Sequence, residues 1–79
     1  MMLTLTIKYK KEYLNKDIQV NSQQKVEDTL NVLLEAGILH NTTPLKDLRI
    51  RSIRRGGFIE KKQNYDQANI HNGDILELI

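Results

Sequence analysis

Apolar residues recur at helical spacing in one stretch of the chain, from Ser22 to Gly37. Positions i, i+4, i+7 and i+11 of this stretch are Val26, Leu30, Leu33 and Gly37, which predicts one apolar side of an α-helix. Gly37 stands where a helix closes on a left-handed residue. Three residues are candidates for the N-cap: Asn21, Ser22 and Gln24. A single amphipathic helix of this length is marginal in water, so the rest of the chain must cover its apolar side.

Alternation of apolar and polar residues predicts the strands. It is strictest from Leu3 to Lys10, where leucine, isoleucine and tyrosine would face a core and threonine and lysine would face water. The expected strands are Leu3–Lys10, Asp17–Val20, Leu48–Ile53, Phe58–Glu60 and Ile75–Ile79. Between them we expect a turn-rich connection at His40–Pro44, glycine turns at Arg54–Gly57 and Asn72–Asp74, and a loop at Lys61–Ile70 anchored by Tyr65 and Ile70.

The order strand, strand, helix, strand, strand, strand predicts an α+β domain that spans residues 1–79. The helix would cover one face of the sheet and leave the other face open and charged. The first and last strands would run parallel at the centre of the sheet, joined by a right-handed crossover.

Composition narrows the class of protein. The 79 residues are 39% hydrophobic and 28% charged, as in an ordinary soluble domain, and the net charge of +2 is too small to indicate nucleic acid by itself. Without cysteine, the chain has no disulfides and no thiolate metal sites. No apolar run is long enough for a membrane span, and the start lacks the pattern of a signal peptide. We therefore expect a cytoplasmic protein.

Candidate catalytic chemistry is sparse. Ser22 and Ser52 stand alone, and His40 and His71 fall in predicted loops without the spacing of a ligand pair. Nothing assembles a nucleophile with a base, a phosphate-binding glycine loop or a pair of metal carboxylates. We predict no catalytic residues, no cofactor and no metal, and hence no enzyme.

The element order, on a chain of this size, resembles the β-grasp fold of ubiquitin, a mixed five-stranded sheet of order 2-1-5-3-4 with one helix. The local match is best over Tyr65–Ile70 and the Asn72–Asp74 turn. The whole chain is also similar to the small bacterial ubiquitin-like proteins of the YukD/EsaB type, which share its length and the Ile-x-Asn-Gly-Asp-x-Leu signature at Ile70–Leu76. This resemblance implies a cytoplasmic accessory or regulatory component of the type VII (ESX-like) secretion systems of Gram-positive bacteria.

The resemblance to ubiquitin also raises an alternative function, that of a modifier or sulfur carrier. Those proteins act through a flexible tail that ends in Gly-Gly, whereas Glu77–Ile79 lie within a predicted strand here. The pair Gly56-Gly57 is internal and is explained by a hairpin turn. We expect a module that binds proteins without being conjugated to them.

The open sheet face supplies a candidate interaction surface, which consists of Lys8, Arg49, Arg51, Ile75, Glu77 and Ile79. In ubiquitin the matching positions carry an apolar patch, but Arg51 and Glu77 stand there in this chain, so the usual readers of ubiquitin should not bind. Two interpretations remain open. The charges either form a docking surface for a protein, or solvate the face and fix strand register through Lys8–Glu77–Arg51 pairing.

A secondary basic rim is formed by Arg54, Arg55, Lys61 and Lys62. These charges would either attract an acidic protein, phospholipid headgroups or RNA, or protect an edge strand from aggregation. Phe58 is the one aromatic residue nearby, so the stacking on which single-stranded nucleic acid relies is poorly supplied. Protein partners are therefore favoured over nucleic acid.

Overall fold

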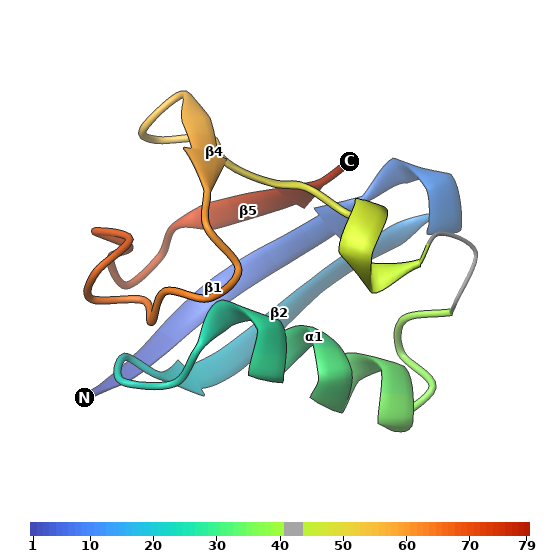
Figure 1. Cartoon of the computed structure of the whole chain (residues 1–79), viewed down its shortest axis with the longest axis horizontal. Coiled ribbons are helices and arrows are strands. Elements are labelled where there is room, and N and C mark those ends of the chain that lie inside the picture. The colour runs from blue at the N-terminus through green and yellow to red at the C-terminus, as the bar shows by residue number, and fades with distance from the viewer. Residues whose placement is uncertain (41–43) are drawn as a thin grey trace.

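Two strands from opposite ends of the chain form the centre of the sheet (Figure 1). The structure is a computed structural model that describes residues 1–40 and 44–79. Its elements are β1 (Met2–Tyr9), η1 (Lys10–Glu12), β2 (Leu14–Asn21), α1 (Val26–Glu35), η2 (Leu45–Asp47), β3 (Ile50–Ser52), β4 (Gly57–Ile59) and β5 (Ile75–Leu78). The sheet order is β2-β1-β5-β3-β4, with β1 and β5 parallel and the other neighbours antiparallel. The predicted order and central parallel pair are confirmed.

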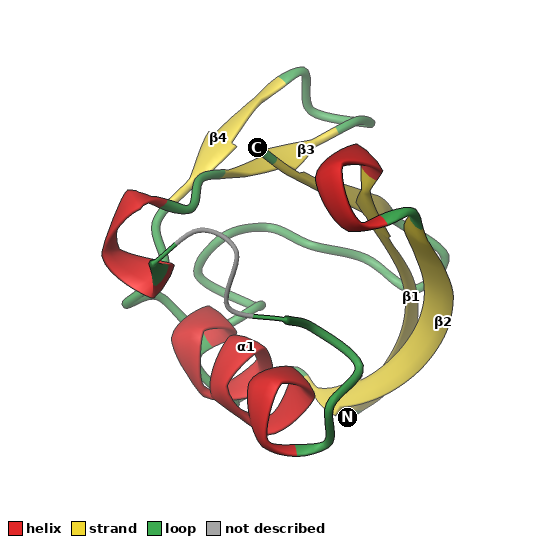
Figure 2. Cartoon of the chain, turned by 90° about the vertical axis from the view of Figure 1, so that its right-hand side faces the viewer, coloured by secondary structure: helices red, strands yellow, loops and turns green. Residues whose placement is uncertain are grey.

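The helix covers one face of the sheet, as Figure 2 shows. The apolar residues of β1 alternate inward as predicted, and Leu3, Leu5 and Ile7 are buried against the helical residues Val26 and Leu30. Burial of such side chains contributes about 1.5–3 kcal/mol each to the free energy of folding. The helix stripe read from the sequence is therefore the stripe that packs on the sheet.

The helix begins later than the sequence predicts, and none of the three proposed caps stands at its start. Lys25 occupies the N-cap position and makes no side-chain cap hydrogen bond. Instead, the N–H groups of Val26 and Glu27 donate to the carbonyls of Gln63 and Lys61, at 3.0 and 2.9 Å. The orphan donors of the first turn are thus satisfied by a segment distant in sequence, which local sequence reasoning cannot detect.

The first hairpin is tighter than expected. β2 begins at Leu14 rather than Asp17, directly opposite Tyr9, because η1 and the left-handed Tyr13 (φ 54°) reverse the chain within four residues. β3 is three residues long and shorter than the predicted Leu48–Ile53, whereas β4 has the predicted length but begins one residue earlier, at Gly57. The predicted connection at residues 41–43 lies outside the described residues.

The loop before β5 is anchored as predicted. Tyr65 and Ile70 are both buried, and the Tyr65 hydroxyl donates to Thr29 Oγ1 at 2.8 Å. Burial raises the pKa of Tyr65 to about 12, although the hydrogen bond to Thr29 opposes that rise. The glycine turns also hold, since Gly56 and Gly73 have φ of 75° and 87°, values that other residues adopt at a cost.

Candidate interaction surface

The register of the central strands places three charged residues in one row on the open sheet face. Glu77 of β5 lies opposite Lys8 of β1 on one side and opposite Arg51 of β3 on the other. The row ends at Asn15 of β2, opposite Lys8, and at Phe58 of β4, opposite Arg51. Since directly opposed residues share a sheet face, the row crosses all five strands on the side away from α1.

Arg51 and Glu77 form an ion pair in which the guanidinium Nη2 donates to the carboxylate. The Glu77 side chain is 16% exposed and that of Arg51 is 43% exposed, so the pair is partly shielded from water. Arg51 Nε is buried and has no hydrogen-bond partner among the described residues. Lys8 lies opposite Glu77, but no ion pair joins these two residues in the structure. The predicted cross-strand pairing is therefore realised for Arg51 and leaves Lys8 available.

Arg49 lies at one end of the open face, beside Ile79, the residue that follows β5. Two backbone hydrogen bonds, of 2.9 and 2.8 Å, join Arg49 and Ile79. The Arg49 guanidinium lies 3.7 Å from the centroid of the Phe58 ring, a cation–π contact. Phe58 is 45% exposed and belongs to the surface, although it was not among the residues predicted for it. The position of Phe58 opposite Arg51 in the β3–β4 hairpin is the sequence feature that could have indicated its place on this face.

The two isoleucines of the predicted surface differ in exposure. Ile75 is half-buried beside Thr6, its neighbour in β1, whereas Ile79 is 50% exposed. Ile79 and Phe58 therefore form small apolar islands bordered by Arg49 and Arg51. Apolar surface rimmed by charge is typical of protein contacts.

The basic rim does not form one cluster of uncommitted charges. Arg54 and Arg55 bind the loop before β5, where their guanidinium groups donate to the carbonyls of Asn69 and Ala68. Lys61 instead donates to the carbonyl of Leu45. Lys62 is exposed. Three of the four charges thus hold backbone segments in place, and a docking role for the rim stays a prediction.

Asp74 connects this rim to the signature turn. Its carboxylate is buried and accepts hydrogen bonds from Arg54 Nε and from the backbone N–H of His71, both at 2.8 Å. Burial alone would raise the pKa of Asp74, but these hydrogen bonds and the charges of Arg54 and His71 lower it below the usual value. The carboxylate therefore remains charged and holds the turn and the Arg54 side chain together.

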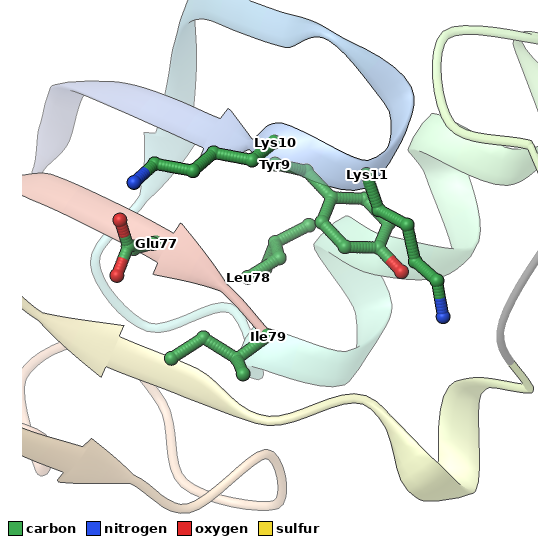
Figure 3. A pocket seen from close by; sticks show the side chains of 6 residues that line it. All are labelled: Tyr9, Lys10, Lys11, Glu77, Leu78 and Ile79. Carbon is green, nitrogen blue, oxygen red and sulfur yellow. The ribbon is translucent and has the colours of Figure 1, made fainter.

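Two shallow hollows flank Lys10 at the end of β1, and the sequence analysis did not identify them. One, of about 330 Å³, is lined by Tyr9, Lys10, Lys11, Glu77, Leu78 and Ile79 (Figure 3). The other, of about 390 Å³, is lined by Lys8, Lys10, Tyr13, Leu14 and Asn15. Lys10 and Lys11 extend in different directions, with Tyr9 and Leu78 between them. Tyr13, which falls between the first two predicted strands, is 97% exposed.

The described residues suggest no other kind of site. Within residues 1–40 and 44–79, no group of three or more His, Asp or Glu side chains is arranged to hold a metal ion. Over the same residues, no helix has both the length and the apolar character needed to cross a membrane.

Similar structures are found among ubiquitin-like proteins. A designed protein based on ubiquitin matches with a TM-score of 0.75 and 23% identity, over 99% of this chain and 87% of that one. The ubiquitin-like domain of an Arabidopsis thaliana protein matches with a TM-score of 0.72 and 15% identity, over 99% of this chain and 76% of that one. No protein-family model matches, and no curated protein does either. The chain therefore has a ubiquitin-like β-grasp fold.

Proposed function

We propose that this ubiquitin-like domain is a non-conjugated protein-interaction module, and that it serves as a cytoplasmic accessory component of a type VII secretion system in a Gram-positive bacterium. Its partner would dock on the open sheet face around Lys8, Arg51 and Ile79. The observation that carries the proposal is the row of charges that crosses this face, in which Lys8 forms no ion pair among the described residues, with exposed apolar groups at its border.

Two features of the open face support docking over simple solvation of the sheet. The Arg51–Glu77 pair holds two side chains in fixed positions, and the stack of Arg49 on Phe58 holds two more. Side chains that are fixed before binding lose less conformational entropy when a partner covers them. The uncovered ring of Phe58 and the exposed Ile79 supply apolar area beside them.

The link to secretion is supported by the resemblance at Ile70–Leu76. In this structure Ile70 and Leu76 are core residues, Gly73 supplies the positive φ, and Asp74 is the buried acceptor of the turn. The signature thus specifies how the chain enters β5, which is the strand that carries Glu77 onto the open face.

The test is affinity capture from cells of the source bacterium, with bound proteins identified by mass spectrometry. A variant that only reverses Lys8 and Arg51 would place three carboxylates in one row and destabilise the sheet, because like charges directly opposed are unfavourable. The triple variant Lys8→Glu, Glu77→Lys, Arg51→Glu keeps alternating charges and inverts the face. We expect its thermal midpoint to stay near that of the wild type while capture of the partner is lost.

A matched control is Lys25→Glu with Lys62→Glu, which changes charge away from the open face and should leave capture unchanged. The proposal requires that a component of the secretion machinery is captured by the wild type and by this control. Capture that survives inversion of the face would exclude the face as the docking site. Covalent adducts that resist boiling in detergent would instead support the modifier alternative.

A further inference from the structure

The turn between β1 and β2 pushes an aromatic ring into solvent. Tyr13 follows η1 at the apex of this turn, in the left-handed conformation with φ 54°, and its side chain is 97% exposed. Non-glycine residues rarely adopt this conformation, and an aromatic ring gains nothing in the free protein from such exposure. The ring of Tyr13 is therefore accessible to a surface outside the domain.

Lysines surround this apex. Residues 8–16, which we call the Tyr13 tip, contain four lysines and one glutamate, a formal charge of +3. That local charge exceeds the net charge of +2 of the whole chain. The arginines of residues 49–55, by contrast, are engaged with other groups, which are Phe58, Glu77, Asp74 and the carbonyls of Ala68 and Asn69. Within the tip, Lys10 and Lys16 are exposed and Lys8 is half-buried, so these three lysines offer positive charge at the surface.

The lysines of the tip lie on both sides of the sheet. Lys8 belongs to the open-face row, whereas Lys16 is opposite the core residue Ile7 and therefore shares the side on which the helix packs. Lys10 stands between two hollows, and the one of about 390 Å³ is lined by Lys8, Lys10 and Tyr13. Cations on both sides of an apex suit a flat anionic surface that meets the tip end-on, while a protein docked on one face would contact only half of them.

We propose that the Tyr13 tip binds the surface of a membrane that contains anionic phospholipids. Headgroup phosphates lie between the ammonium groups of Lys8, Lys10 and Lys16, and the ring of Tyr13 enters the interfacial layer with its hydroxyl toward water. Tyrosine favours this layer because one end of the ring is apolar and the other polar. Lysines near an anionic leaflet are attracted to it, each by about a fivefold gain in partitioning.

This inference shares Lys8 with the docking face proposed above, whereas Lys10, Tyr13 and Lys16 belong to the tip alone. Arg51 and Phe58 of the docking face lie on β3 and β4 rather than on the β1–β2 turn. Nucleic acid fits the tip less well, since one tyrosine offers no platform on which successive bases stack.

The test uses the fact that the chain contains no tryptophan. The variant Tyr13→Trp places a single fluorescent reporter at the apex. With vesicles of phosphatidylserine and phosphatidylcholine at about 1:2, at about 0.1 M salt, we expect a blue shift of its emission and co-sedimentation of the wild-type protein. With phosphatidylcholine alone, or at about 1 M salt, both signals should disappear because the charges are absent or screened.

Matched variants separate the tip from overall charge. Lys10→Glu with Lys16→Glu should lower the partition coefficient by at least about tenfold. Lys25→Glu with Lys62→Glu changes the net charge equally and should lower it by less than about threefold, because Lys25 caps α1 and Lys62 follows Lys61, whose carbonyl accepts from the first turn of α1. The start of α1 lies at the other end of the molecule from the β1–β2 turn (Figure 1). Tyr13→Asn, which keeps a residue tolerant of positive φ, should weaken binding several-fold without loss of thermal stability.

Equal weakening by the two double variants would overturn the inference, because binding would then follow net charge alone. An emission spectrum that anionic vesicles leave unchanged would overturn it as well. A blue shift with single-stranded RNA but not with vesicles would assign the tip to nucleic acid. The partner-capture experiment tests protein binding to the open face, whereas the vesicle experiment tests lipid binding by the tip. Either proposal can therefore fail while the other stands.

Discussion

The backbone N–H of Thr4 donates to the side-chain oxygen of Asn72 at 2.7 Å, and the carbonyl of Thr4 accepts from the N–H of Gly73 at the same distance. The Asn72 amide thus stands where a neighbouring strand would offer a backbone carbonyl. The next bond, from the N–H of Thr6 to the carbonyl of Asp74, continues toward the paired part of β1 and β5. A side chain therefore extends the central ladder beyond the start of β5.

Removal of this side chain should weaken the entry into β5. Asn72→Ala leaves the Thr4 N–H without its acceptor, and we expect a loss of about 0.5–1.5 kcal/mol in the free energy of unfolding. Asn72→Asp retains an acceptor oxygen and should cost less. Urea unfolding of the three proteins measures the difference. Equal losses for the two variants would show that the hydrogen bond to Thr4 does not stabilise the domain.

The central architecture was predictable because it follows from side-chain periodicity. Alternation in β1 and helical spacing at Val26, Leu30 and Leu33 are written in consecutive residues, and each pattern permits one buried face. The β-grasp order followed from resemblance together with the rules for parallel connections. These features depend on which residues are buried, and the spacing of apolar residues along the chain indicates this directly.

The rest depended on contacts between distant segments. The carbonyl of Gln63 replaces a side-chain cap for α1, and Arg54 binds Asp74 rather than joining a basic rim. Neither partner is implied by its neighbours in the sequence. On the candidate surface, the Lys8–Glu77–Arg51 row followed from register, but the stack of Arg49 on Phe58 and the exposure of Tyr13 required coordinates.

The Asp74–Arg54 pair should make stability depend on acid pH. The pKa of Asp74 is lower in the folded protein than its ordinary value of 3.8, so the unfolded state binds the proton more readily. The stabilisation from the charged carboxylate is therefore complete above about pH 4 and is lost as the pH falls through the folded pKa. Urea unfolding across about pH 2–6 follows this loss.

The variant Asp74→Asn isolates this contribution from those of the other carboxyl groups. It keeps an acceptor for Arg54 and His71 but cannot ionise. The wild type should exceed it in free energy of unfolding at neutral pH, and the gap should close as the pH falls below about 4. A gap that does not change with pH would mean that the charge of Asp74 contributes nothing.

Leu30 tests the packing of the helix on the sheet. Its side chain is 2% exposed in the core, and Leu30→Ala should cost about 2–5 kcal/mol, which is enough to unfold a domain of this size at moderate temperature. Val32 lies in the same helix and is 55% exposed. Val32→Ala should therefore leave the thermal midpoint nearly unchanged. Comparable losses for the two variants would contradict the observed orientation of α1.

The Arg51–Glu77 ion pair allows the stabilising and docking roles of the open face to be separated. A cross-strand pair of this exposure should contribute about 0.2–1 kcal/mol, since water still screens Arg51 and its buried Nε has no hydrogen-bond partner within residues 1–40 and 44–79. Single and double substitution of both residues by glutamine gives their coupling energy in a double-mutant cycle. The coupling should shrink at high salt.

The same glutamine variants show whether a partner recognises the Arg51 guanidinium or the intact Arg51–Glu77 ion pair. If a partner contacts the Arg51 guanidinium, Arg51→Gln should weaken its binding by more than the small loss of stability explains. Glu77→Gln frees Arg51 from its carboxylate and should leave binding equal or tighter, because the cation no longer has to be shared. Titration of the partner by calorimetry measures its affinity for each variant. Equal weakening by both variants would mean that the partner recognises the intact ion pair rather than the arginine.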